Sequence, residues 1–164
     1  MVATIGLTGL RPDPSRASDI ASPPYDVIKP GTPLEARLSE QADSLFHIIL
    51  GSDPAAARDR MLGGGALIVD EEPSYYVYEQ TWDGGQRTGV FAAAAVSPYE
   101  DKQIIRHEKT FDDKVKGGIA MRRATGLHIG PVFVLTRAPI AAALEQAKAE
   151  SAPVYDFVSE FGGF

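Results

Sequence analysis

The feature that most restricts the fold of this chain is a segment, residues 75–97, with the pattern of a β-hairpin. Residues 75–82 alternate between the two faces of a strand and are rich in tyrosine. Asp83-Gly84 then supplies a tight turn whose residues tolerate positive φ angles. Residues 88–97 return as the partner strand, with alanines small enough for a helix to pack closely. We therefore expect a sheet built around a central antiparallel hairpin.

Helix signals occur on both sides of this hairpin. Thr32 can cap a helix over about 33–43, with proline at its first position. Asp53-Pro54 opens a second helix to about residue 62, which Gly63-Gly64-Gly65 ends. Two more helices are predicted over about 113–127 and 139–150, and short strands over 4–10, 46–50, 67–69, 104–105, 131–136 and 154–158. The pattern predicts an α+β fold, with a mixed, largely antiparallel sheet and three to four packed helices in one domain, 1–164.

Composition narrows the classes of function. The 164 residues are 44% apolar, which is enough to bury a core. The net charge of −6 argues against nucleic acid or an anionic membrane as partner. The chain has no cysteine, which excludes disulfides, thiolate zinc sites and a cysteine nucleophile.

The ends and hydropathy of the chain predict its location. The N-terminus has no basic, apolar leader, and no run approaches the ~18 apolar residues that span a bilayer. We therefore expect a cytoplasmic protein. The chain ends abruptly at Phe161-Gly162-Gly163-Phe164, which suggests a shortened or N-terminal form of a longer protein. The sequence does not predict an oligomeric state.

Positive charge gathers in one part of this acidic chain. Between Lys102 and His128 there are seven Lys or Arg residues against three Asp or Glu, a local balance of +4. Clustered cations suit a small anionic ligand such as a phosphate or carboxylate. The alternative is a solvated helix face with scattered charges.

Residues 106–110 are the most specific candidate for a functional site in this region. His107 can transfer protons near neutral pH, and Glu108 can accept a proton or orient a donor. Thr110 can instead cap the following helix, with acidic residues in its first turn. Both interpretations are compatible, because a helix start beside cations is also an anion site. The candidate ligand-binding residues are Arg106, Lys109, Thr110, Lys114, Arg122 and Arg123.

The remaining candidates are weaker. Asp26 follows a rigid double proline and is either a second acid of the site or a turn residue. The three histidines lack metal-ligand spacing, so no metal site is predicted from them, and His47 reads as a hydrogen-bonded core residue. The segment Gly63-Gly64-Gly65 lacks the lysine and the spacing of a P-loop. The chain also has no Gly-x-Ser-x-Gly motif, which argues against an α/β-hydrolase.

Several motifs in one order resemble a known family, the domain of unknown function 1015 (DUF1015). The resemblance covers roughly residues 5–158 and is carried by 22–28 (SPPYDVI), 72–78 (EPSYYVY), 87–89 (RTG), 105–110 (IRHEKT), 123–125 (RAT) and 130–133 (GPVF). The match is to the N-terminal part of that family. A more distant similarity to the ParB/sulfiredoxin-like free-serine kinases is a hypothesis that follows from the resemblance.

The resemblance implies phosphoryl transfer to a small metabolite. ATP, ADP or pyrophosphate with Mg²⁺ would supply the phosphate, the basic cluster would hold it, and Glu108 or Asp26 would take the hydroxyl proton. The chain departs from the family pattern at three positions. Gly117 and Gly118 stand where relatives carry an acid and an arginine, and His128 stands where many have asparagine.

Three hypotheses follow. The first is a kinase-like phosphotransferase with His107, Glu108 and Asp26 as catalytic residues. The second is a non-catalytic or regulatory domain that binds a nucleotide or a phosphorylated metabolite with the same cations. The third is a structural or interaction fragment, suggested by Phe161 and Phe164.

Overall fold

The computed structural model describes residues 2–106, 109–158 and 161. The predicted α+β class is confirmed, because helices pack with small antiparallel sheets. The chain divides into two compact units. Unit 1 contains the N-terminal segment up to Gly9, Asp70–Val115 and Pro131–Pro153, and unit 2 contains Leu10–Val69, Lys116–Gly130 and the segment from Val154. Among the described residues, no helix is both long enough and apolar enough to cross a bilayer.

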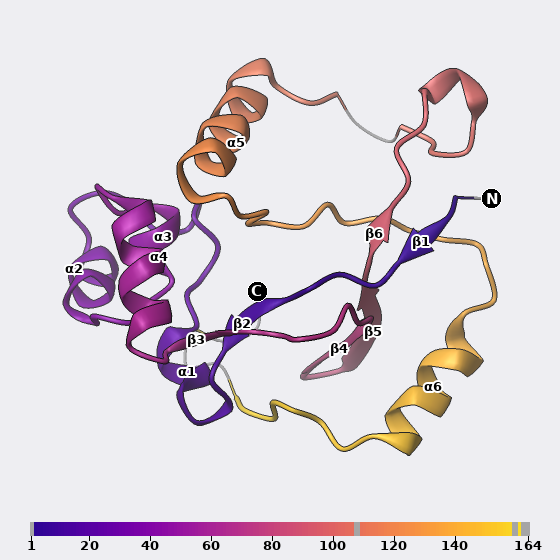
Figure 1. Cartoon of the computed structure of the whole chain (residues 1–164), viewed down its shortest axis with the longest axis horizontal. Helices are drawn as coiled ribbons and strands as arrows, with labels where there is room; N and C mark the ends of the chain where they lie inside the picture. The colour runs from indigo at the N-terminus through magenta and orange to yellow at the C-terminus, as the bar shows by residue number, and fades with distance from the viewer. Residues whose placement is uncertain (1, 107–108, 159–160, 162–164) are drawn as a thin grey trace. The chain divides into compact units, whose positions relative to one another are not determined.

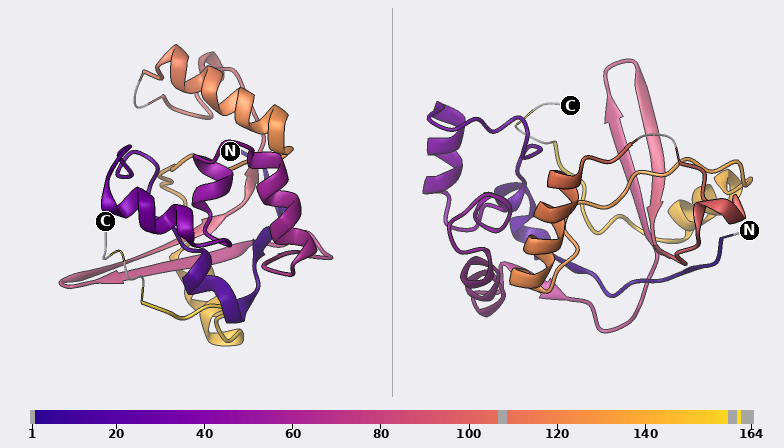
Figure 2. Two further views of the ribbon diagram at one scale, coloured as in Figure 1. Left: turned by 90° about the vertical axis from the view of Figure 1, so that its left-hand side faces the viewer. Right: turned by 90° about the horizontal axis from the view of Figure 1, so that it is seen from above.

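Unit 1 is organised by the predicted hairpin. Strands β4 (Tyr76–Trp82) and β5 (Gly85–Phe91) pair in register over seven residues, from Tyr76 opposite Phe91 to Trp82 opposite Gly85 (Figure 2). Gly84 takes φ +86° in the turn between them, a conformation that glycine adopts without strain. A second antiparallel pair joins β1 (Thr4–Ile5) to β6 (Ala93–Ala94), and a short 3₁₀ helix, η2, covers Tyr99–Asp101.

One face of the hairpin carries α6 (Ala141–Glu150). Lys148 Nζ donates to Glu79 Oε2 on β4 at 2.7 Å and to Glu145 Oε1 at 2.9 Å. Thr88 also donates to the Glu79 carboxylate, at 2.8 Å. Hydrogen bonds from Lys148 and Thr88 lower the pKa of Glu79, and the bonds to Glu79 and Glu145 raise the pKa of Lys148. This ion pair joins α6 to the sheet.

Unit 2 is helical around one small sheet. Strand β2 (Leu10–Pro12) pairs antiparallel with β3 (Leu67–Val69), and helices α2, α3 and α4 lie together in Figure 1. The helices span Pro14–Arg16 (η1, a 3₁₀ helix), Ala17–Ile20 (α1), Pro33–Glu40 (α2), Phe46–Ile49 (α3) and Pro54–Gly63 (α4). The final helix, α5 (Asp112–Thr125), begins in the residues of unit 1 and ends in those of unit 2.

The described core lies in unit 2. One cluster surrounds Met61, which is fully buried, and consists of Ile20, Ile48, Ala57, Met61, Ala66 and Leu67. A second joins Ile28, Leu38 and Phe46, against which Phe161 packs. Because α3 contributes Ile48 to one cluster and Phe46 to the other, this short helix connects both.

The predicted helix ends of unit 2 are confirmed in detail. Thr32 Oγ1 accepts from the Glu35 N–H at 3.3 Å, and Asp53 Oδ1 accepts from the Ala56 N–H at 3.0 Å. At the other end of α4, Gly65 takes φ +68°, and the Ala66 N–H donates to the Met61 carbonyl at 2.8 Å. This is the Schellman arrangement that glycine permits after a helix.

Some predicted strands are wrong. Residues 46–50 were expected as a strand, but Phe46–Ile49 is a helix, because a short apolar run fits a buried helix as well as a strand. Residues 104–105, 131–136 and 154–158 are not strands, since no described segment pairs with them. The expected strand 4–10 is interrupted, with β1 ending at Ile5 and β2 beginning at Leu10.

Candidate functional site

The predicted site centres on residues 102–123, which we call the basic segment. Its described cations are all exposed to solvent: Lys102, Arg106, Lys109, Lys114, Lys116, Arg122 and Arg123. His107 and Glu108, two of the predicted catalytic residues, lie outside the described residues. The described part of the segment therefore offers cations at a surface.

The start of the basic segment has a defined local geometry in unit 1. Lys102 follows η2 with φ 53° and ψ 18°, and is the only described non-glycine residue with a positive φ. The Arg106 guanidinium carbon lies 5.8 Å from the centre of the Tyr99 ring. A cation at this distance is attracted by the face of an aromatic ring. Tyr99 thus helps to position Arg106 while both side chains stay exposed.

Helix α5 separates the remaining predicted residues. Lys114 lies in its first turn, and Arg122 and Arg123 lie in its last turn. The Val115 N–H donates to the Phe111 carbonyl at 3.1 Å, so Phe111 has the N-cap position that was predicted for Thr110. Charges on this helix also have a structural explanation. Asp112 and Asp113 complement the positive end of the helix dipole, and the two arginines complement the negative end.

Asp26 occupies the turn that was one of its two predicted roles. The Val27 N–H donates to the Pro24 carbonyl at 3.0 Å, and the Asp26 side chain is exposed. Asp26 belongs to unit 2, as do Arg122 and Arg123, whereas Arg106, Lys109, Thr110 and Lys114 belong to unit 1.

The C-terminal end of α5 is anchored by a residue that sequence reasoning missed. Arg58 on α4 donates to the carbonyl of Thr125. Thr125 is fully buried, its hydroxyl donates to the Met121 carbonyl at 2.8 Å, and the same oxygen accepts from the Leu127 N–H at 3.1 Å. These bonds fix the helix end that carries Arg122 and Arg123. The arginine–helix-end contact joins residues 67 positions apart, so no local pattern could have revealed it.

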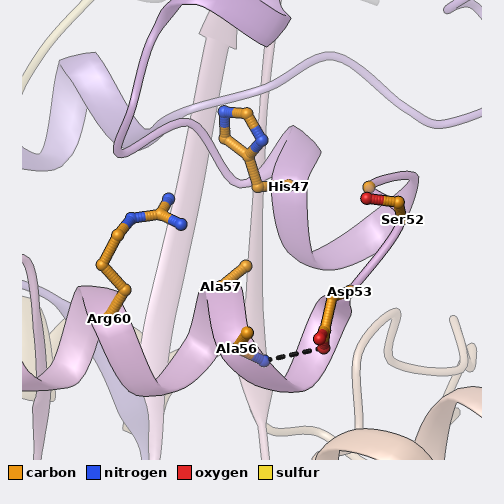
Figure 3. Close-up of a pocket in the computed structure, with 7 residues that line it drawn as sticks. His47, Ser52, Asp53, Ala56, Ala57 and Arg60 are labelled. Carbon is orange, nitrogen blue, oxygen red and sulfur yellow. Dashed lines mark hydrogen bonds between the residues drawn. The ribbon is translucent and has the colours of Figure 1, made fainter.

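A hollow of about 170 Å³ lies elsewhere in unit 2, between α3 and the start of α4 (Figure 3). It is lined by His47, Gly51, Ser52, Asp53, Ala56, Ala57 and Arg60. Several polar groups that line this hollow already form hydrogen bonds within the protein. His47 Nε2 donates to the Gln41 carbonyl at 3.0 Å, Asp53 caps α4, and Arg60 donates to the Ala42 carbonyl. His47 is thus a half-buried, hydrogen-bonded residue, and none of the predicted site residues that the structure describes lines this hollow.

The match to a protein family covers nearly the whole chain. Residues 5–164 match the family described as Protein of unknown function (DUF1015). The chain belongs to this family. Comparison with curated proteins and with solved structures found no match.

Two adjacent glycines, Gly117 and Gly118, lie inside α5 of this DUF1015 chain. The sequence resemblance implies an acid and an arginine at these positions in relatives. A Cβ atom at either position would meet no described atom within 4 Å. The described surroundings of this DUF1015 helix therefore leave room for a Cβ atom at both positions. Among the described residues, no group of three or more His, Asp or Glu side chains is arranged to hold a metal ion.

Proposed function

We propose that this chain acts in the cytoplasm and binds a small phosphate-bearing molecule through the basic segment. The ligand class includes ATP, ADP, pyrophosphate and phosphorylated metabolites. The observation that carries the proposal is the concentration of exposed cations between residues 102 and 123 in a chain with a net charge of −6. Cations gathered on an acidic protein attract anions locally.

Two adjacent cations of unit 2 are available for a ligand. The side chains of Arg122 and Arg123 make no ion pair with any other residue that the structure describes. An arginine can hold a phosphate through two parallel N–H···O bonds. Because the side chains are exposed, binding should weaken as salt screens the charges.

A thermal-shift and calorimetric titration with pyrophosphate and ATP, with and without Mg²⁺, tests the proposal. Bound ligand should raise the melting temperature, since it binds the folded state preferentially. The double variant Arg122→Gln, Arg123→Gln should lose this stabilisation. The control, Lys29→Gln with Arg137→Gln, removes the same charge outside the basic segment and should keep it. Equal loss in both variants would mean general charge attraction, and no heat with any ligand would refute the proposal.

Phosphoryl transfer is the second candidate, and one sequence feature favours it. Glu108 and His107 stand between Arg106 and Lys109, so a proton acceptor would adjoin cations that neutralise phosphate charge. In this hypothesis Glu108 or Asp26 accepts the proton of a small hydroxyl substrate such as serine, and Mg²⁺ bridges the phosphates. Glu108→Gln should then abolish product formation while leaving the melting temperature and ligand affinity nearly unchanged. Normal turnover in that variant would end the hypothesis.

Substitutions at Gly117 and Gly118 in α5 can distinguish a binding protein from a phosphotransferase. If loss of the acid and the arginine has made this chain a binding protein, Gly117→Asp with Gly118→Arg should create or increase phosphoryl transfer. Gly117→Ala with Gly118→Ala is the matched control, because it restores helix propensity without restoring charge. Equal activity in both variants would show that these two positions do not decide turnover.

A further inference from the structure

Residues 154–161 of unit 2, which we call the strap, are attached to the rest of that unit through two aromatic side chains. The first is Tyr155. Its hydroxyl donates to the Pro12 carbonyl at 2.6 Å and accepts from Arg11 Nη1 at 3.0 Å. The Arg11 guanidinium carbon also lies 6.0 Å from the centre of the Tyr155 ring. Tyr155 is therefore attached to β2 by both its hydroxyl and its ring.

The second aromatic anchor of the strap is Phe161. The guanidinium carbon of Arg37, on α2, lies 4.9 Å from the centre of the Phe161 ring, a distance at which the ring face attracts a cation. The same ring packs at the edge of the buried cluster that contains Leu38. Each anchor thus combines an aromatic ring with an arginine, and tyrosine and arginine are among the residues that most often carry the binding energy of an interface.

The part of the strap between its two anchors is loosely attached. Phe157 is 46% exposed, and Val158 is 94% exposed. Within the residues that the structure describes, no backbone–backbone hydrogen bond joins the strap to another segment. A segment of this kind opens at a lower cost in free energy than the core beneath it.

The core of unit 2 is complete without the strap. The buried members of both described clusters lie between Ile20 and Leu67 in the sequence. Tyr155 belongs to neither cluster, and Phe161 is a partly buried neighbour of the second. The strap can therefore leave while both clusters keep their buried members.

We propose that the strap is a releasable internal ligand of unit 2, and that the surface around Arg11, Pro12 and Arg37 binds an acidic, extended peptide with two aromatic side chains six positions apart. The sequence of the strap, VYDFVSEF, defines this partner, since it carries two acidic residues and no basic one. Opposite charges favour its approach to a surface that contains two arginines. Because the strap is tethered, it competes with a free peptide at an effective concentration on the order of millimolar.

Competition in the whole chain tests the proposal. The probe is a fluorescein-labelled peptide of residues 153–162, and fluorescence anisotropy measures its binding. The double variant Tyr155→Ser, Phe161→Ser should remain folded and should bind the probe at least about tenfold more tightly than the wild type, whose own strap competes. Adding Arg37→Gln to this variant should weaken binding severalfold. The matched control, Phe157→Ser with Val158→Ser, changes two exposed apolar residues of the same strap and should bind the probe no better than the wild type.

Each contrary result overturns the proposal. Absence of binding to the double variant would refute a peptide-binding surface. Equal binding to the wild type and the double variant would place the probe on another surface, and equal binding of a probe with serine at both aromatic positions would refute recognition of the aromatic side chains. Loss of the helical circular-dichroism signal in the double variant would show that the strap is part of the core and is not releasable.

Discussion

Replacing Met61 with alanine gives a direct measure of the core of unit 2. Met61 is fully buried on α4 and packs in the cluster that contains Ile20, Ile48 and Leu67. The substitution removes three heavy atoms from a site where water has no access. It therefore tests whether these helices and β3 share one packed core.

The expected loss of stability follows from two contributions. Removing three buried methylene-sized groups costs about 2.4 kcal/mol at ~0.8 kcal/mol each. The cavity left behind adds to this, because neighbours from separate elements relax only partly, and buried Met→Ala changes cost roughly 2–5 kcal/mol in total. We expect about 3 kcal/mol. With a slope of ~2 kcal/mol per molar urea, the midpoint should fall by roughly 1.5 M.

Urea unfolding followed by far-ultraviolet circular dichroism measures this change. Most of the helical signal comes from unit 2, which contains α1 to α4 and most of α5, whereas α6 and Trp82, the single tryptophan, lie in unit 1. Met61→Leu nearly conserves volume and should cost less than ~1.5 kcal/mol. Val96→Ala, at an exposed site, should stay within about 0.5 kcal/mol. A Met61→Ala midpoint equal to that of Val96→Ala would refute the packing described for this core.

Two further predictions concern a helix end and an ion pair. Gly65→Ala should lower the free energy of unfolding by about 1 kcal/mol in the same urea assay, because alanine is strained at φ +68°. The control Gly63→Ala, inside the helix, should be neutral or should raise that free energy by up to ~1 kcal/mol. Equal effects of the two substitutions would contradict the Schellman motif at the end of α4. The Glu79–Lys148 pair should stabilise unit 1 at intermediate pH. Its contribution is lost as pH falls through the lowered pKa of Glu79 and as pH rises through the raised pKa of Lys148. Glu79→Gln should therefore flatten the pH dependence of the melting temperature, and an unchanged profile would contradict a stabilising role.

Features set by neighbouring residues could be predicted from the sequence. The caps at Thr32 and Asp53, the glycine end of α4 and the turn at Gly84 each depend on backbone preferences within a few positions. The hairpin was predictable for the same reason. Its alternation is long enough to distinguish a strand from a helix.

Features that depend on distant partners could not be predicted. The segment Phe46–Ile49 forms a helix that places Ile48 in one buried cluster and Phe46 in the other, and a short apolar run does not reveal this. Residues 131–136 have strand propensity, but a strand also needs a neighbour. The composition of the basic segment was evident from the sequence, whereas the exposure of its side chains and the anchoring of α5 by Arg58 are tertiary properties.

The alternation of the two units along the chain affects the order in which a newly made chain can fold. The chain passes from one unit to the other after Gly9, Val69, Val115, Gly130 and Pro153. Residues 10–69 already hold both buried clusters, so this piece can collapse while synthesis continues. The pairing of β1 with β6 must wait until residue 94 has left the ribosome. The first nine residues therefore remain without their partners while the helices that follow them are already packed.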